Sequence, residues 1–190
     1  MLKRIRESTK LKKAKYAFAQ SVNRIESSEN LLLFCMPRGG STWLTEVLAA
    51  SSNLPVLWEP LHLRYAPEFQ NINLGWEQVM SKDGEWAELK EKFEKLFQGK
   101  ILNDWNCRVS PARSFVWSTK MIVKFCRANG MLLWLTENFS FKHKPVLLLR
   151  HPFAVVASQM RHMGFDGVHE TISVPQTPHN DFWLFRKICG

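Results

Sequence analysis

Residues 31–48 read LLLFCMPRGGSTWLTEVL, and this stretch is the strongest indication of the fold. An apolar run from Leu31 to Met36 stops at Pro37, and Arg38, two glycines and two hydroxyl residues precede an amphipathic segment. The pattern predicts a buried strand, a tight loop and the first turn of a helix. A glycine loop that leads into a helix N-terminus suits an anion, because its backbone N–H groups point one way and the helix dipole adds positive potential. We therefore expect this loop to bind a phosphate or sulfate group.

Short apolar runs alternate with helix-like segments along the rest of the chain. Strands are predicted at Leu31–Met36, Leu54–Trp58, Met121–Phe125 and Val146–Leu149, and helices at Thr42–Ala50, Glu85–Gln98, Met131–Phe139 and Pro152–Met163. This alternation is typical of an α/β fold. We predict a three-layer, P-loop-like fold in which helices flank a mostly parallel central sheet. The segment Glu170–Asp181, with two prolines and many small polar residues, is predicted to be a loop.

The composition is that of an ordinary soluble globular protein, with 190 residues of which 45% are hydrophobic and 23% charged. No apolar run approaches the roughly 18 residues of a membrane span, and no signal-peptide core follows the basic N-terminus, so we expect a cytoplasmic protein. The four cysteines form no metal-binding pair, and we expect no metal. Cys35 and Cys126 lie in apolar runs and are predicted to be buried free thiols.

Residues 1–30 are predicted to form a basic amphipathic helix, separate from a domain at 31–190. They carry +5 of the formal net charge of +9, so the rest of the chain is only mildly basic. That distribution favours a small anionic ligand over nucleic acid. The helix has two interpretations: it packs on the domain edge with a solvated basic face, or it touches an anionic membrane or a partner.

The loop differs from the P-loop of nucleoside triphosphatases, in which a lysine directly precedes the hydroxyl residue. Here Gly40 directly precedes Ser41, and the nearby cation, Arg38, lies upstream. No apolar run ends in an aspartate that could hold a metal ion. The sequence therefore indicates a phosphate cradle without the parts that bind Mg²⁺ and a triphosphate, and a kinase-like activity is disfavoured.

Residues 37–44 resemble the 5′-phosphosulfate loop of sulfotransferases that use 3′-phosphoadenosine 5′-phosphosulfate (PAPS). The resemblance implies that the 5′-phosphate and sulfuryl end of the donor is held by Arg38, Gly39, Gly40, Ser41 and Thr42. It also implies that Trp43 lies against the adenine. Gly39 stands where the family more often has serine. The loop taken alone also fits a tight turn without a ligand.

A second motif resembles the 3′-phosphate site of the same family. The apolar run Val146–Leu149, predicted to be buried, ends in Arg150, Pro152 marks a helix start, and Ser158 follows the arginine by eight residues. Arginine offers a planar fork to phosphate oxygens, and serine adds a hydroxyl donor. Arg150 and Ser158 are thus expected to bind the 3′-phosphate. His151 is interpreted as structural, because the family often has aspartate there.

Sulfuryl transfer needs a group that takes the proton of the acceptor. Glu59 follows the second predicted strand, in a Glu-Pro element similar to that of carbohydrate-type and bacterial sulfotransferases, and is our candidate general base. His62 is the alternate, and a turn residue paired with an arginine is the competing interpretation of Glu59. Lys124 interrupts an apolar strand and is expected to steady the bridging or sulfuryl oxygens. Arg38 and the loop N–H groups would stabilise charge on the transferring group.

The resemblance runs from Leu31 to about His162 and more weakly to the end, so 31–190 is interpreted as a partial sulfotransferase domain without its C-terminal part. It implies transfer of a sulfuryl group from PAPS to a hydroxyl or amine of a glycan, lipid or small molecule, without a metal. The alternative is a truncated nucleotide-binding module that binds the donor or its product without turnover. A nucleic-acid binder is the weakest hypothesis, because the excess charge is concentrated in residues 1–30.

Overall fold

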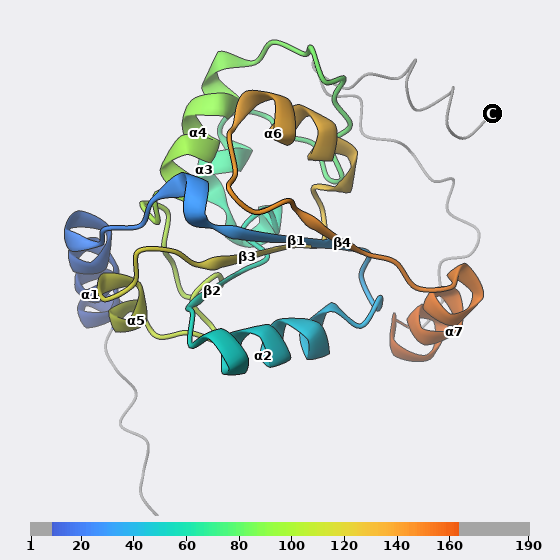
Figure 1. The fold of residues 1–190 in the computed structure, drawn as a ribbon, viewed down its shortest axis with the longest axis horizontal. Coiled ribbons are helices and arrows are strands. Elements are labelled where there is room, and N and C mark those ends of the chain that lie inside the picture. The colour runs from blue at the N-terminus through green and yellow to red at the C-terminus, as the bar shows by residue number, and fades with distance from the viewer. Residues whose placement is uncertain (1–8, 164–190) are drawn as a thin grey trace, which may run out of the picture.

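The computed structural model describes residues 9–163 and contains one four-stranded, all-parallel sheet (Figure 1). Its strands are β1 (Leu31–Cys35), β2 (Val56–Trp58), β3 (Ile122–Phe125) and β4 (Val146–Leu148), in the order β2-β3-β1-β4. The four predicted strands are confirmed to within two residues at each end. The predicted α/β class with a parallel sheet is therefore correct.

Helices cover both faces of the sheet. They are α1 (Thr9–Val22), α2 (Ser41–Ser52), α3 (Pro67–Gln70), α4 (Ala87–Phe97), α5 (Ala112–Val116), α6 (Leu132–Asn138) and α7 (Pro152–Met163). Figure 1 shows α2 on one face, α3, α4 and α6 on the other, and α1 beside α5 at the end where the strands begin. This gives the expected three layers. Among residues 9–163, none of the helices has the length and apolar character that crossing a membrane would require.

Helix α4 illustrates how the sequence builds the core. Leu89, Phe93, Leu96 and Phe97 recur on one face of the helix and are completely buried. The ring of Phe93 lies 6.3 Å, centroid to centroid, from that of Phe125 on β3, so this face packs against the sheet. The helix ends before Gly99, which adopts a left-handed conformation (φ 66°). Helix α4 thus anchors the long excursion between β2 and β3.

The order of the strands creates a topological switch point between β1 and β3. The chain leaves β1 through α2 on one face of the sheet, and it reaches β4 from β3 through α6 on the other face (Figure 1). Ligands of open parallel sheets bind where connections depart from adjacent strand ends in opposite directions. The loop after β1 and the residues that follow β3 therefore lie at the position where a ligand is expected.

The predicted N-terminal helix is shorter than expected. Within the described residues α1 ends at Val22, and the expectation that it runs to residue 30 is wrong. The side-chain amide of Asn23 donates to the carbonyl groups of Ala19 and Gly99, both at 3.0 Å, and this ends the helix. The turn carries Ile25 into the core, where it is 7% exposed. Residues 1–8 and the predicted loop at 170–181 lie outside the described residues.

Strand β4 corrects a second expectation. Val146–Leu149 was predicted to be buried, yet Val146, Leu147 and Leu149 are 48%, 46% and 73% exposed. In the described part of the chain β4 is the edge strand of the sheet and pairs with β1. An apolar run reports the tendency to form a strand, but it does not report what covers that strand.

Candidate functional site

The loop after β1 has a shape that its glycines permit. Arg38 (φ 68°) and Gly40 (φ 95°) both adopt left-handed conformations, and the peptide N–H of Gly39 donates to the carbonyl of Met36 at 2.9 Å. A Cβ atom on residue 39 would stand 2.9 Å from that same carbonyl oxygen. This contact is too close for a side chain, so a loop of this shape requires glycine where the resembling family more often has serine. The left-handed Arg38 stores strain of a kind that clusters at functional sites.

The loop opens a cradle at the N-terminus of α2. Gly40 is the N-cap of the helix, and no side chain caps the first turn. The first helical hydrogen bond runs from the N–H of Leu44 to the carbonyl of Gly40 (3.3 Å), so the N–H groups of the turn before it have no helical partner. Nothing lies within 4 Å of the point where a Cβ of Gly40 would stand. There is therefore free space beside Gly40, at the end of the helix whose N–H groups and dipole favour an anion.

The two halves of the sequence motif meet in space. Arg38 Nε donates to Ser158 Oγ at 3.2 Å across 120 residues of chain, and Arg150 donates to the carbonyl oxygen of Arg38 at 3.0 Å across 112 residues. This contact follows from the pairing of β1 with β4, which places their carboxyl ends side by side. The predicted 5′-phosphosulfate loop and the predicted 3′-phosphate residues are thus in direct contact.

The remaining motif residues differ in their exposure. Thr42 is exposed and Trp43 is 69% exposed, so both are open to a ligand from solvent. Ser41 is buried instead, and its Oγ lies 3.9 Å from Cys126 Sγ. His151 is exposed, and its ring lies beside Phe153.

Glu59 occupies the centre of a small ionic network at the same edge of the sheet. Its Oε1 accepts a hydrogen bond from Lys124 Nζ at 3.1 Å, and its Oε2 accepts one from Arg127 at 2.8 Å. Lys124 lies on β3 and is 1% exposed, and its Nζ is also 3.4 Å from the centre of the Trp58 ring. Glu59 itself has a left-handed backbone (φ 40°), held by a hydrogen bond from its N–H to the Lys124 carbonyl.

The network sets the ionisation of Glu59. Burial raises the pKa of the Glu59 carboxyl, but the charge of Lys124 and the hydrogen bonds from Lys124 and Arg127 outweigh it and hold the pKa below its usual value. The carboxylate is therefore ionised at neutral pH and is a weaker base than a free glutamate. The pairing with an arginine, which was the competing interpretation of Glu59, is present in the structure alongside the pairing with Lys124.

Arg127 is a member of this site that sequence analysis missed. Besides its ion pair with Glu59, its guanidinium lies 4.2 Å from the centre of the Trp76 ring. Its Nε is buried without a hydrogen-bond partner among the described residues. The available signal was its place: Arg127 follows the third predicted strand, at the same edge of a parallel sheet as Glu59.

Two thiols meet behind the loop. Cys35 ends β1, Cys126 follows β3, and their sulfur atoms are 3.3 Å apart. Both are buried and free, as predicted. The hydrogen bond from Cys126 lowers the pKa of Cys35 to about 7 against the opposing effect of burial. The same hydrogen bond, together with burial, raises the pKa of Cys126. Their pairing was not predictable, because it depends on β1 and β3 being neighbours.

His62, the alternate base, lies in an aromatic cluster on the excursion after β2. Its ring is 4.6 Å from that of Trp105 and 5.1 Å from that of Trp76, centroid to centroid. Burial and the charge of Arg127 lower the pKa of His62, so the imidazole is neutral at neutral pH. Its Nδ1 is buried without a hydrogen-bond partner in the described part of the chain. The Nε1 of Trp105 donates to the Glu59 carbonyl at 3.1 Å, which ties this cluster to the ionic network.

Within residues 9–163 no three of the histidine, cysteine, aspartate and glutamate side chains gather as metal ligands would. Comparison of the chain with protein-family models, with curated proteins and with solved structures gives no match. The case for a function therefore rests on the geometry described above.

Proposed function

We propose that this protein transfers a sulfuryl group from PAPS to a hydroxyl or amine of a glycan, lipid or small-molecule acceptor. One observation carries the proposal: the hydrogen bond between Arg38 and Ser158, which joins the two motif halves across 120 residues. This bond lies where the two motif halves follow the neighbouring carboxyl ends of β1 and β4. A donor with phosphates at both of its ends needs this proximity.

In this proposal the donor lies along the edge of β1 and β4. Its 5′-phosphosulfate end occupies the open cradle at Gly40, where Arg38 supplies positive charge. Arg150 and Ser158 hold the 3′-phosphate, and the exposed ring of Trp43 is open to stack on the adenine. The buried position of Ser41 favours a role in shaping the loop.

The reaction is an in-line displacement at sulfur. The acceptor oxygen or nitrogen forms a bond to sulfur while the bond from sulfur to the bridging phosphate oxygen breaks, and 3′-phosphoadenosine 5′-phosphate leaves. Glu59 receives the proton, and Lys124 lies beside it to steady the developing charge on the sulfuryl or bridging oxygens. Because its ion pairs lower the basicity of Glu59, we propose that the proton moves late, when the forming bond has made the acceptor more acidic.

The proposal is tested with labelled PAPS and pooled glycans, lipids and phenols. Label should pass to an acceptor fraction with the wild-type chain and should be lost with Glu59→Gln. His62→Asn distinguishes the two base candidates, since it should retain turnover if Glu59 is the base. Glu94→Gln is the matched control, because this exposed glutamate lies on α4 among residues outside the site. Absence of transfer to every acceptor fraction would contradict the proposal.

A second candidate function is a module that binds the donor or its product without turnover. The observation that favours it is the complete pairing of Glu59, both of whose carboxylate oxygens are engaged by cations. Calorimetric titration with 3′-phosphoadenosine 5′-phosphate separates the two candidates. Binding without transfer of label supports the module, and binding with transfer supports the enzyme.

We also propose a cytoplasmic location. It is supported by Cys35 and Cys126, two free thiols 3.3 Å apart, a pair that persists unoxidised in a reducing compartment. Quantification of free thiols in protein isolated under acid quench tests this proposal.

A further inference from the structure

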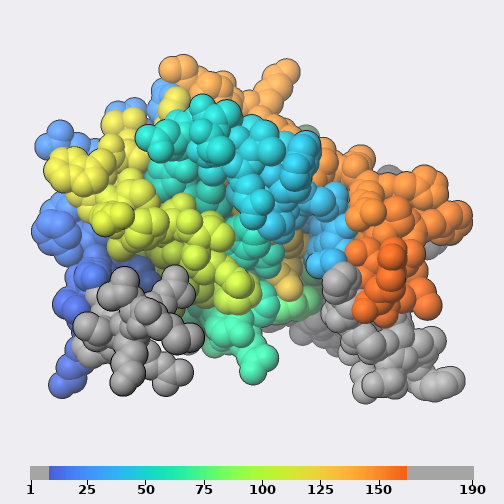
Figure 2. Space-filling model, turned by 90° about the horizontal axis from the view of Figure 1, so that it is seen from below, coloured from blue at the N-terminus to red at the C-terminus, as the bar shows by residue number. Residues whose placement is uncertain are grey.

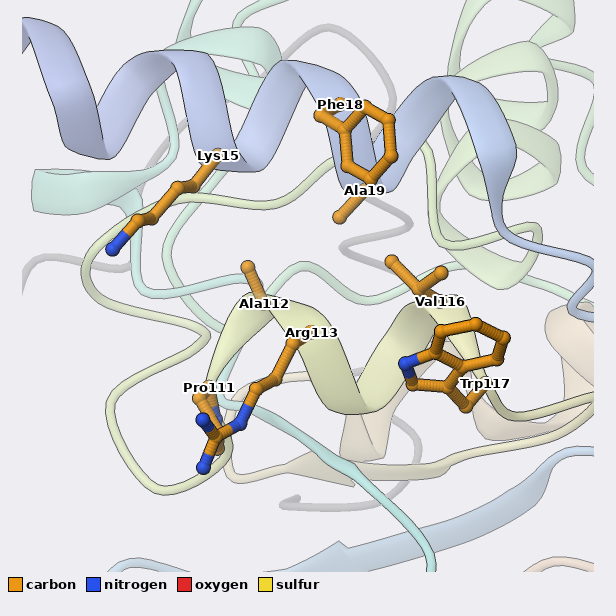
Figure 3. A pocket seen from close by; sticks show the side chains of 8 residues that line it. All are labelled: Lys15, Phe18, Ala19, Pro111, Ala112, Arg113, Val116 and Trp117. Atoms are coloured by element: carbon orange, nitrogen blue, oxygen red, sulfur yellow. The ribbon is translucent and has the colours of Figure 1, made fainter.

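A groove between α1 and α5 combines exposed apolar side chains with a cationic rim. We call it the α1–α5 groove. It consists of two adjoining hollows of about 460 Å³ each, which share Phe18, Val116 and Trp117. Figure 3 shows Phe18 and Trp117 toward one end of the first hollow and Lys15 and Arg113 toward the other. The second hollow adds the side chains of Val22 and Arg24.

The apolar residues of this groove are unusually open to water. Trp117 is 88% exposed and Phe18 is 62% exposed, although both carry large rings. Val22, one turn after Phe18 on α1, is 39% exposed. Exposed apolar patches bounded by polar residues mark surfaces that bind another partner. The groove therefore has the character of an interface that is uncovered within the described residues.

The charge around the groove has one dominant sign. Helix α1 contains four lysines and no acidic residue. Asp104, an acidic residue beside the helix, forms an ion pair with Lys12 (3.4 Å) and accepts a hydrogen bond from the hydroxyl of Tyr16 (2.7 Å). Among the described residues, the two hollows are lined by the cations Lys15, Arg24 and Arg113 and by no acidic side chain. Glu26, an exposed acidic residue beyond the end of α1, lines neither hollow. The partner of the groove should therefore be anionic as well as apolar.

The groove and the candidate site lie at opposite ends of the strands. Helix α1 precedes β1 and α5 precedes β3, so the groove borders the amino ends of the strands. The cradle at Gly40 and the residues Arg150 and Ser158 lie beyond the carboxyl ends. Figures 1 and 2 agree in placing α1 and α7 at opposite ends of the molecule. A partner on the groove would leave the candidate site uncovered.

We propose that the α1–α5 groove docks this protein on the surface of a bilayer that contains anionic lipids. Tryptophan and phenylalanine side chains enter the headgroup region of a bilayer, and lysine and arginine side chains at the rim attract anionic headgroups. A second copy of the chain fits less well, because it would bring one lysine-rich α1 against another. Docking in this orientation directs the candidate site away from the bilayer, toward acceptors in the surrounding water. The proposal does not depend on the sulfotransferase activity.

The test is co-sedimentation of the full chain with vesicles of phosphatidylcholine, with and without phosphatidylserine. We expect binding to the anionic vesicles, and we expect it to fall as salt is raised. Trp117→Ala should weaken the partition constant about tenfold, because a large ring no longer enters the interface. Arg24→Gln combined with Arg113→Gln should weaken it about fivefold for each charge removed.

Matched controls distinguish vesicle binding through the groove from nonspecific binding by other exposed residues. Leu133→Ala removes an apolar side chain that is 66% exposed on α6, and Lys82→Gln with Lys144→Gln removes two exposed charges elsewhere. These variants should bind vesicles as the wild type does. Equal binding to neutral and anionic vesicles, or an unchanged partition constant for Trp117→Ala, would overturn the proposal. So would self-association in sedimentation velocity that Trp117→Ala abolishes, since it would assign the groove to a second copy.

Discussion

The ionic network at Glu59 allows a prediction that separates the carboxylate from its cations. Glu59→Gln leaves Lys124, which is 1% exposed, beside Arg127 without a compensating anion. Removal of one partner of a buried ion pair costs about 3–5 kcal/mol, since an uncompensated buried charge remains. The glutamine amide still accepts a hydrogen bond, so we expect the lower end of that range, about 3 kcal/mol.

Lys124→Met should cost much less. It leaves Glu59 paired with Arg127 at 2.8 Å, so that the remaining charges balance. Methionine fills a volume similar to that of the lysine chain and keeps the contact with Trp58. Because no uncompensated buried charge remains and the volume is conserved, we expect a loss of only about 1 kcal/mol. The two variants should therefore differ by about 2 kcal/mol in the free energy of unfolding.

Urea denaturation at neutral pH measures this difference. A shift of the midpoint without a change in the slope reports a change in stability. Glu91→Gln is the control, because Glu91 and Lys95 form an exposed ion pair on α4, and its removal should cost less than about 0.5 kcal/mol. If Lys124→Met destabilises the protein as much as Glu59→Gln does, the electrostatic account of the network is refuted.

The same network predicts how stability depends on pH. The folded pKa of Glu59 lies below its ordinary value of 4.5, so its stabilising effect is complete above that value and is lost as the pH falls through the folded pKa. The gap in stability between the wild type and Glu59→Gln should therefore be full at neutral pH and narrow below pH 4.5. A gap that is constant across this range would show that the loss does not come from the charge.

Two further variants probe the loop and the thiols behind it. Gly40→Ala should lower the free energy of unfolding by about 1–2 kcal/mol in urea denaturation, because residue 40 has a φ of 95°, and a wild-type midpoint would contradict this reasoning. A thiolate absorbance titration should show a step near pH 7 from Cys35, which Cys126→Ala moves upward because the hydrogen bond that lowers the pKa is removed. Cys107→Ala should leave that step in place, since burial raises the pKa of Cys107 to about 12, and a step that persists near pH 7 in Cys126→Ala would contradict the assignment.

The sequence predicted the local elements of this fold well. The strands at Leu31 and Met121 are runs of apolar residues bounded by polar or turn-forming ones, and such runs report strands wherever they lie. The amphipathic spacing of α4 and the proline at the start of α7 gave those helices in the same way. These signals are local, so a single sequence carries them.

What the sequence did not predict depends on contacts between distant elements. The exposure of β4 depends on which elements cover it, and the pairing of Cys35 with Cys126 depends on β1 lying beside β3. Asn23 ended α1 earlier than the apolar spacing indicated, because its side chain bonds to Gly99, 76 residues away. Each of these errors concerns a contact that periodicity does not encode.

In the candidate site, too, the residues in motifs were predictable from the sequence, and the contacts between distant elements were not. Arg38, Arg150 and Ser158 were named from motif positions, and the structure brings the three together. Glu59 and Lys124 were named separately, and their direct ion pair follows from the pairing of β2 with β3. Arg127 was missed because no motif contains it, although its place after β3 puts it at the edge where Glu59 lies.

The most direct test of the account is calorimetric titration with 3′-phosphoadenosine 5′-phosphate. The wild type should bind the nucleotide, and Arg150→Ala should weaken binding by about tenfold or more, since a hydrogen bond to a charged group contributes about 1.5–3 kcal/mol. Arg161→Ala, which removes an exposed arginine of α7 whose Nε donates to a backbone carbonyl within that helix, should bind as the wild type does. Absence of binding to the wild type, or equal affinity in Arg150→Ala, would contradict the claim that this edge of the sheet holds a donor by both of its phosphates.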